Sequence, residues 1–209
     1  MVILSILFVF TIAFFSLNYG LAQKDLQELQ SSLSSLTTTG PGMSINNSLA
    51  SNTTIVGTDS ATSPPIQDIV TIGSFGDDRI NGTNETDVII GLLGADTIRG
   101  GNGDDKIQGN EDLDKLYGEA GNDLIQGGEA TDQLYGGQGD DILSGGMGDN
   151  FLVGEQGNDK LYGGAEDDIL EGGGGADYFD CGEGIDIIID SHIEEGDDNA
   201  GNCEEILNR

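Results

Sequence analysis

The sequence predicts an all-β fold, a parallel β-roll, for the stretch from Gly73 to Ile189. Three observations carry this prediction. The stretch is a nine-residue unit repeated without an insertion, and thirteen copies fill its 117 positions. Glycine and aspartate recur at fixed places in the unit, and a large apolar residue recurs at the eighth place. A fixed period of this kind is typical of a repeat architecture in which each copy packs on its neighbours.

The composition excludes several classes of protein. The chain has 209 residues, a formal net charge of −31, 35 glycines and no tryptophan. Its apolar content is too low for an ordinary globular core of this length. So acidic a surface excludes nucleic acid as a partner, because phosphate binding needs Lys and Arg. The charge favours metal cations instead, although one His and two Cys offer few zinc ligands.

The chain begins with an apolar segment. Residues 2–17 are almost wholly apolar, but this run is short for a membrane span. We interpret residues 1–22 as a secretory signal peptide cleaved after Ala22, which leaves no stable membrane span. An uncleaved signal anchor is the alternative. Both interpretations place the acidic remainder outside the cytoplasm, so we expect a secreted, extracellular or cell-surface protein.

A linker is expected between this segment and the repeats. Residues 23–72 are rich in Ser, Thr and Asn and contain few large apolar residues, which is typical of a flexible connection. Four leucines near its start have helical spacing and favour a short, frayed helix. They are Leu26, Leu29, Leu33 and Leu36.

Each copy divides into a six-position loop and a three-position strand. Within the strand, alternate side chains point to opposite faces, so the eighth residue points inward and its neighbours point outward. Two copies then form one turn of the roll, and two thin parallel sheets face each other. The expected core is Ile80, Ile89, Ile98, Ile107, Leu116, Ile125, Leu134, Leu143, Leu152, Leu161, Leu170, Phe179 and Ile188.

The loops have the composition of a calcium site. The clearest copy begins Gly100-Gly101-Asn102-Gly103-Asp104-Asp105, with glycine at the first, second and fourth positions and aspartate at the sixth. Glycine permits positive φ and a close approach of the backbone, so that several carbonyl oxygens face one space. Carbonyl and carboxylate oxygens suit Ca²⁺, which accepts six to eight oxygen ligands, better than Mg²⁺.

With this G-G-x-G-x-D-x-U-x pattern, where U is a large apolar residue, the stretch resembles the RTX (repeats-in-toxin, or hemolysin-type) calcium-binding family. The resemblance covers more than half of the chain and implies a right-handed parallel β-roll, a β-helix solenoid. It also implies that calcium lies between loops of successive turns, held by loop carbonyls and by the sixth-position aspartate. The implied metal ligands are Asp78, Asp87, Asp96, Asp105, Asp114, Asp123, Asp132, Asp141, Asp159, Asp168, Asp177 and Asp186.

The sixth-position residues form two ladders, each of which takes every second copy. The first edge carries Asp87, Asp105, Asp123, Asp141, Asp159 and Asp177, and the second carries Asp78, Asp96, Asp114, Asp132, Asn150, Asp168 and Asp186. On the second edge, Asp112, Ala130 and Glu166 replace the fourth-position glycine, whereas on the first edge only Glu85 does. Our hypothesis is that the first edge binds calcium more completely.

The same aspartates predict that calcium controls folding. Stacked carboxylates repel one another until a cation lies between them, so the free energy of metal binding becomes free energy of folding. We expect a chain that is largely unfolded without calcium and rich in β-structure with it.

Two cysteines in an exported chain indicate one disulfide, Cys181–Cys203. Cys181 replaces the first glycine of the last copy, and Cys203 lies beyond the repeats. The bridge would hold residues 190–209 over the open end of the roll as a C-terminal cap, which repeat rods need. Two free thiols are the alternative.

No catalytic motif accompanies the repeats: the sequence contains neither H-E-x-x-H nor G-x-S-x-G. It therefore predicts a protein that is not an enzyme, with calcium ions and envelope or matrix components as partners. The expected role is an extracellular or cell-surface structural or adhesive module. The alternatives are a calcium-dependent polysaccharide-modifying enzyme and a toxin-like secreted protein built on the same roll.

Overall fold

The computed structural model describes residues 44–48, 51–56, 69–190, 197–200, 202–203 and 205–208. The predicted signal peptide and the predicted helix over residues 24–36 lie outside these residues. Within the described part every regular element is a β-strand. That part contains no helix long and apolar enough to cross a membrane.

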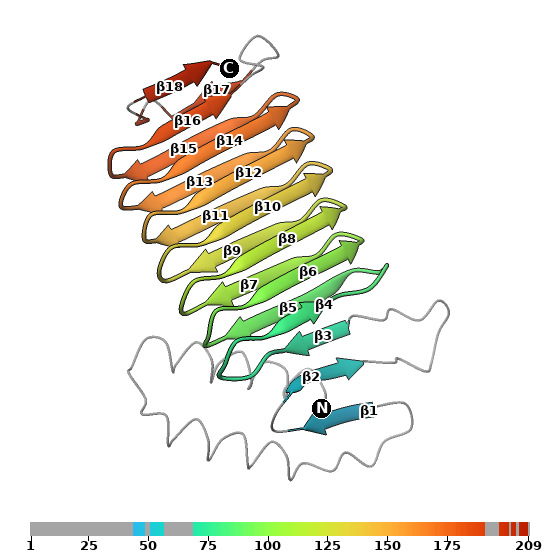
Figure 1. The fold of residues 1–209 in the computed structure, drawn as a ribbon. Helices are drawn as coiled ribbons and strands as arrows, with labels where there is room; N and C mark the ends of the chain where they lie inside the picture. The colour runs from blue at the N-terminus through green and yellow to red at the C-terminus, as the bar shows by residue number, and fades with distance from the viewer. Residues whose placement is uncertain are drawn as a thin grey trace. The chain divides into compact units, whose positions relative to one another are not determined.

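The strands form two sheets (Figure 1). The ten-stranded sheet contains β1 (Ser44–Ser48), β2 (Ser51–Val56), β3 (Ile69–Ile72), β5 (Asp87–Leu92), β7 (Lys106–Asn110), β9 (Leu124–Gly128), β11 (Ile142–Met147), β13 (Lys160–Ala165), β15 (Tyr178–Glu183) and β17 (Asp198–Asn199). The eight-stranded sheet contains β4 (Arg79–Asn81), β6 (Thr97–Asn102), β8 (Lys115–Ala120), β10 (Gln133–Gln138), β12 (Phe151–Gln156), β14 (Ile169–Gly174), β16 (Ile187–Asp190) and β18 (Glu205–Asn208).

Successive turns stack in register, so that equivalent residues lie two repeat copies apart. In the eight-stranded sheet, Leu134 of β10 pairs with Leu116 of β8 and Leu152 of β12. In the ten-stranded sheet, Leu143 of β11 pairs in the same way with Leu161 of β13. From β3 onward the strands within each sheet run parallel, two repeat copies form one turn, and the roll has about seven turns. The parallel β-roll predicted from the sequence is confirmed.

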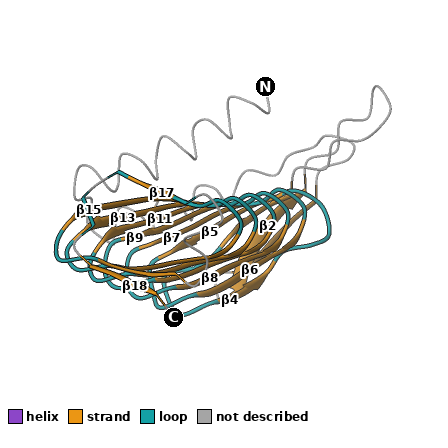
Figure 2. Ribbon diagram, turned by 90° about the horizontal axis from the view of Figure 1, so that it is seen from above, coloured by secondary structure: helices purple, strands orange, loops and turns teal. Residues whose placement is uncertain are grey.

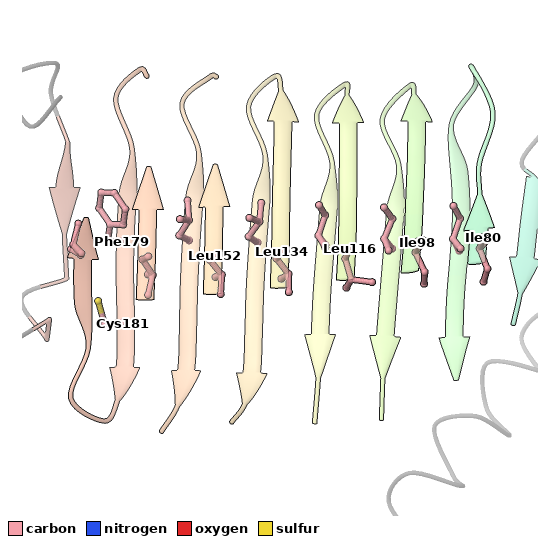
Figure 3. Close-up of a cluster of buried hydrophobic side chains, with 14 residues drawn as sticks. Ile80, Ile98, Leu116, Leu134, Leu152, Phe179 and Cys181 are labelled. Atoms are coloured by element: carbon pink, nitrogen blue, oxygen red, sulfur yellow. The ribbon is translucent and has the colours of Figure 1, made fainter. Parts of the chain in front are cut away.

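A single line of apolar side chains fills the space between the two sheets (Figure 3). Each eighth-position residue from Ile80 to Ile188 is at most 2 % exposed, as predicted. The residues on either side of it in each strand are more exposed, because side chains alternate between the two faces of a strand. Burial of each aliphatic side chain stabilises by about 1.5–3 kcal/mol, so the apolar eighth position is the main source of hydrophobic stabilisation in every turn.

The outer face of the eight-stranded sheet carries a row of interacting side chains. The rings of Tyr117 and Tyr135 stack at 4.8 Å, and Phe151 meets Tyr135 edge-on at 6.2 Å. The guanidinium of Arg99 lies 4.4 Å from the centre of the Tyr117 ring and pairs with Glu119 at 2.8 Å. Such cross-strand contacts are ordinary in stacked sheets and support the in-register pairing.

Three strands lie within the segment predicted as a linker. Strands β1 and β2 pair in antiparallel fashion, β2 pairs with β3 in the same way, and β3 joins β5 in parallel. The ten-stranded sheet therefore extends beyond the first repeat copy, and of the added strands only β2 runs opposite to the repeat strands.

The C-terminal segment continues both sheets by a further turn. Strand β17 pairs with β15, and β18 pairs with β16, both in parallel. Cys181, which is fully buried, is bonded to Cys203 with a Cα–Cα distance of 5.3 Å. The predicted disulfide is confirmed, and it joins the tail to the last repeat copy. Strands β17 and β18 thus continue the two sheets past the last repeat copy, and Cys203 packs against the apolar line there.

We predict that Cys203→Ser lowers the free energy of unfolding by about 3 kcal/mol, the value expected when a bridge closing a loop of this size is lost. Urea denaturation in excess calcium measures the change. A reductant should lower the stability of the unaltered protein to that of the variant and leave the variant unchanged. The prediction would be contradicted if the variant were less stable than the parent but the reductant did not lower the free energy of unfolding of the parent.

Candidate metal centre

The sixth-position residues line the two edges of the roll, where the loops stack behind one another (Figure 2). Every predicted ligand except Asp78 is at most 2 % exposed, and Asp78, in the first copy, is half-buried. Asn150 is buried at the equivalent place. The structure thus brings the predicted residues together as two ladders and confirms that each ladder takes every second copy. Their role as metal ligands remains a proposal.

One oxygen of nearly every buried carboxyl group is used to join successive turns; the exception is Asp87, whose Oδ1 is buried without a hydrogen-bond partner. Asp105 Oδ1 accepts a hydrogen bond from the backbone N–H of Asp87, one turn earlier, at 2.7 Å. Asp123 Oδ1 accepts in the same way from Asp105, and Asp141 Oδ1 from Asp123, both at 2.7 Å. The second edge repeats the pattern, for instance between Asp114 and Asp96 at 2.8 Å. These bonds fix the orientation of each carboxyl group.

In most copies the second oxygen has no donor. In eight copies Oδ2 is buried without a hydrogen-bond partner, namely in Asp96, Asp105, Asp114, Asp123, Asp132, Asp141, Asp159 and Asp168. A buried, charged oxygen without a partner is strongly unfavourable. A cation beside it would remove that penalty, and the repetition of the arrangement in eight copies shows that it is a property of the repeat.

Carbonyl oxygens lie close to these second oxygens. A side chain on Gly100, the first residue of its loop, would meet both the carboxylate of Asp105 and the carbonyl oxygen of Gly118, the latter at 2.9 Å. Gly118 stands in the same relation to Asp123 and to the carbonyl oxygen of Gly136. Glycine is therefore favoured at the first position of these loops, because a side chain there would occupy the space on which these acceptor oxygens converge.

Burial raises the pKa of these carboxyl groups to near neutrality. The pKa of Asp105, Asp141 and Asp159 is raised to about 7, and that of Asp114 to about 8, from an ordinary value of 3.8. Removal from water is the main cause in each case, while the backbone hydrogen bond to Oδ1 lowers the pKa and neighbouring carboxylates raise it further. Without a cation, the folded roll therefore favours protonated aspartates.

The loops of the two edges differ in backbone strain, as the unequal loss of glycine suggests. The non-glycine residues with positive φ are Glu119 and Glu155 on the first edge and Leu92, Asn110, Asp112, Ala130 and Glu166 on the second. Each costs about 1 kcal/mol or more relative to glycine. The second edge therefore has the more strained loops, in keeping with the hypothesis that it binds calcium less completely.

Hydrogen bonding between loops also distinguishes the edges. On the first edge, the N–H of a fourth-position glycine such as Gly121 donates to a loop carbonyl one turn later, here Gln138 O at 2.8 Å. On the second edge, Gly148 N–H donates at 2.8 Å to Oε2 of Glu166, one of the residues that replace glycine. Side-chain acceptors thus take part in joining the loops of the second edge.

The donor set fits calcium. Nowhere in the described ranges do three or more His, Cys, Asp or Glu side chains gather as a cluster able to hold a metal ion. The candidate sites instead combine a carboxylate oxygen with nearby backbone carbonyl oxygens, which are hard ligands suited to Ca²⁺. A bound calcium ion would supply two positive charges beside a buried, otherwise unpaired carboxylate oxygen.

One residue of the ladder was missed by the sequence prediction. Asp197 Oδ1 accepts from the backbone N–H of Asp177 at 2.8 Å, so the tail adds a further carboxyl group to the first edge. Asp197 lies outside the repeat, and its separation from Asp177 is two positions longer than the regular spacing of the ladder. The only sequence signal is an Asp-Asp pair in a segment expected to cap the roll.

Together, the sheets and the two carboxylate ladders define a parallel β-roll of the calcium-binding type. The family model of the RTX calcium-binding nonapeptide repeat matches residues 72–107, 90–125, 99–134, 108–143, 117–152, 126–161 and 153–188. These overlapping matches cover more than half of the chain, which therefore belongs to the RTX calcium-binding nonapeptide repeat family. Repeats of this family bind calcium, so calcium is the expected ion. Among curated proteins, no match to the chain was found.

We predict that the calcium-free protein becomes less stable as the pH rises from about 5 to 8. Because burial raises the pKa of the folded-state carboxyl groups to about 6–8, the folded chain binds more protons than the unfolded chain in this range. Stability is therefore greatest at the acidic end and is lost as the pH passes through the folded-state values. Urea denaturation of calcium-stripped protein measures this, and greater stability at pH 8 than at pH 5 would contradict it.

Proposed function

We propose that this chain is an exported calcium-binding protein whose roll folds when calcium binds and then serves as a structural or adhesive module outside the cell or at its surface. The proposal keeps the sequence-based division of the chain. Residues 1–22 are the signal peptide, 23–72 the linker, 73–189 the calcium-binding roll and 190–209 the cap.

The observation that carries the proposal is the set of buried carboxylate oxygens without donors. Each turn buries two sixth-position side chains, and nearly all of them are aspartates. At neutral pH the folded chain must either protonate these groups against their tendency to ionise or place cations among them. Calcium satisfies the oxygens without protonation, and its binding energy then contributes directly to folding.

Folding on calcium is compatible with export. RTX repeat proteins are typically secreted. A chain that stays unfolded where calcium is scarce and folds where it is plentiful would be competent for transport first and rigid afterwards. The apolar run over residues 2–17 supports export through an N-terminal signal.

A structural role suits the distribution of the chain's functional groups. The buried aspartates are committed to joining turns through Oδ1, and the family fold is a structural calcium-binding fold that is usually non-catalytic. We therefore propose that the roll is not an enzyme. A rigid rod with two regular outer faces is well suited to contacts with envelope or matrix components.

Circular dichroism with and without calcium tests the proposal. We expect the far-ultraviolet spectrum of an unfolded chain after calcium is removed by a chelator, and a β-rich spectrum when calcium is restored to millimolar concentration. Magnesium at equal concentration should not restore it, because Mg²⁺ demands a smaller octahedral site. A spectrum that is unaffected by chelator at neutral pH would overturn the proposal.

Neighbouring aspartates provide a matched pair of variants. Asp141 is buried with an unpartnered Oδ2, whereas Asp140 is exposed and its Oδ1 accepts the N–H of Asn158 at 2.8 Å. We predict that Asp141→Asn weakens calcium binding at that site at least tenfold, the smallest effect expected when a charged interaction worth about 1.5 kcal/mol is lost. Asp140→Asn, which removes the same charge, should change the calcium midpoint of folding little. Equal shifts for the two variants would contradict the assignment.

A further inference from the structure

Three repeat copies differ from the eight copies with an unpartnered Oδ2 in the hydrogen bonding at that position. They begin at Gly73, Gly82 and Gly145, and in each a donor from the chain itself stands where the other copies have none. This pattern is invisible in the family match, which covers all three copies.

The first two copies satisfy the carboxylate through their second residue. Ser74 donates its backbone N–H to Asp78 Oδ2 at 2.6 Å and its hydroxyl to the same oxygen at 2.9 Å. Thr83 does the same for Asp87 Oδ2, at 2.6 and 2.9 Å. Each of these second oxygens therefore already has two donors within its own loop.

The backbone of these two loops explains the difference. In every copy from Gly91 onward, the second-position residue has positive φ, whether it is a glycine or one of Leu92, Asn110, Glu119 and Glu155. Ser74 and Thr83 do not have positive φ. Their N–H groups turn toward the carboxylate, so these loops close on themselves in a conformation that the other loops do not adopt.

The third copy uses an amide in place of a carboxylate. Asn150 Oδ1 accepts the backbone N–H of Asp132 at 2.9 Å, as an aspartate does in the other copies. Its Nδ2 stands against Gly145, where Oδ2 of an aspartate lies elsewhere, and donates to the carbonyl oxygen of Gly148 at 2.8 Å. The amide nitrogen thus takes the place of the carboxylate oxygen beside which a calcium ion is expected in other copies.

We propose that the copies beginning at Gly73, Gly82 and Gly145 bind no calcium, because Ser74 and Thr83 donate hydrogen bonds to the second carboxylate oxygen and Asn150 replaces that oxygen with an amide nitrogen. This rests on the proposed calcium-binding function and specifies its pattern. The first turn of the roll then folds without metal, and the calcium-dependent turns assemble on its strands. Beyond the first turn, the second edge has one further metal-free step, at Asn150.

The test compares two Asn→Asp variants in calcium-stripped protein titrated with calcium chloride, with bound ions counted by native mass spectrometry. Asn150→Asp places a carboxylate at the buried step, and Asn158→Asp places one at an exposed loop position that is aspartate in other copies, such as Asp104 and Asp140. We expect Asn150→Asp to bind one calcium ion more than the parent, and Asn158→Asp to bind the same number as the parent. The second variant controls for attraction by added negative charge.

The reciprocal change is Asp168→Asn, one turn after Asn150 on the same edge. Asp168 Oδ1 accepts the N–H of Asn150 at 2.7 Å, a bond that an amide oxygen keeps. We expect this variant to bind one ion fewer than the parent. For the first turn, Thr83→Gly restores the usual second residue and should add one ion.

The outcomes separate the two levels of the proposal. A parent chain that binds calcium, with unchanged counts in Asn150→Asp and Asp168→Asn, would overturn the pattern and leave the calcium function standing. Equal gains in Asn150→Asp and Asn158→Asp would also overturn the pattern. A parent chain that binds no calcium would overturn the proposed function itself.

Discussion

Burial of a carboxyl side chain by almost every nine-residue copy is the physical constraint on which the rest of the roll depends. The carboxyl group is placed there because its Oδ1 joins one turn to the next, and the loop can be so tight because glycine occupies its first position. The result is a column of buried, like-charged groups along each edge. A soluble fold tolerates such a column only if each group is neutralised or paired.

The chain meets this constraint in three ways. Protons can neutralise the aspartates, and the raised pKa values place this solution at mildly acid pH. Calcium can pair with them at neutral pH, which makes the fold depend on the ion. Ser74 and Thr83 donate hydrogen bonds to the second carboxylate oxygen and Asn150 replaces that oxygen with an amide nitrogen, so this position needs neither a proton nor calcium in these three copies. Calcium dependence is thus unevenly distributed along a roll whose sequence period is uniform.

The parts predicted correctly from the sequence are those that follow from the period. The inward eighth position, the pairing of Leu134 with Leu116 and the two ladders all depend on strict nine-residue spacing, which leaves only one register. The Cys181–Cys203 bridge followed from counting cysteines in an exported chain. Strands β1 and β2 were not predicted, because their Ser- and Asn-rich sequence lacks the alternation of a half-buried strand.

Features that depend on the direction of a polar group, and not on residue spacing, were also not predicted from the sequence. From the sequence, Asn150 is only an uncharged residue in the ladder of aspartates, whereas in the structure its amide nitrogen takes a defined place and hydrogen-bonds to the carbonyl oxygen of Gly148. Ser74 and Thr83 occupy an ordinary variable position, and only the backbone φ shows that their N–H groups face the carboxylate. Asp197 lay outside the period because two residues are inserted before it.

The central claim is that calcium occupies the places beside the unpartnered second oxygens, and the most direct measurement is a crystal structure grown in saturating calcium, with the ions located by anomalous scattering. The account predicts ions beside Oδ2 of residues such as Asp105 and Asp141, and none beside Asn150 or within the loops of Ser74 and Thr83. Ordered water without calcium beside Asp105 and Asp141 would contradict it.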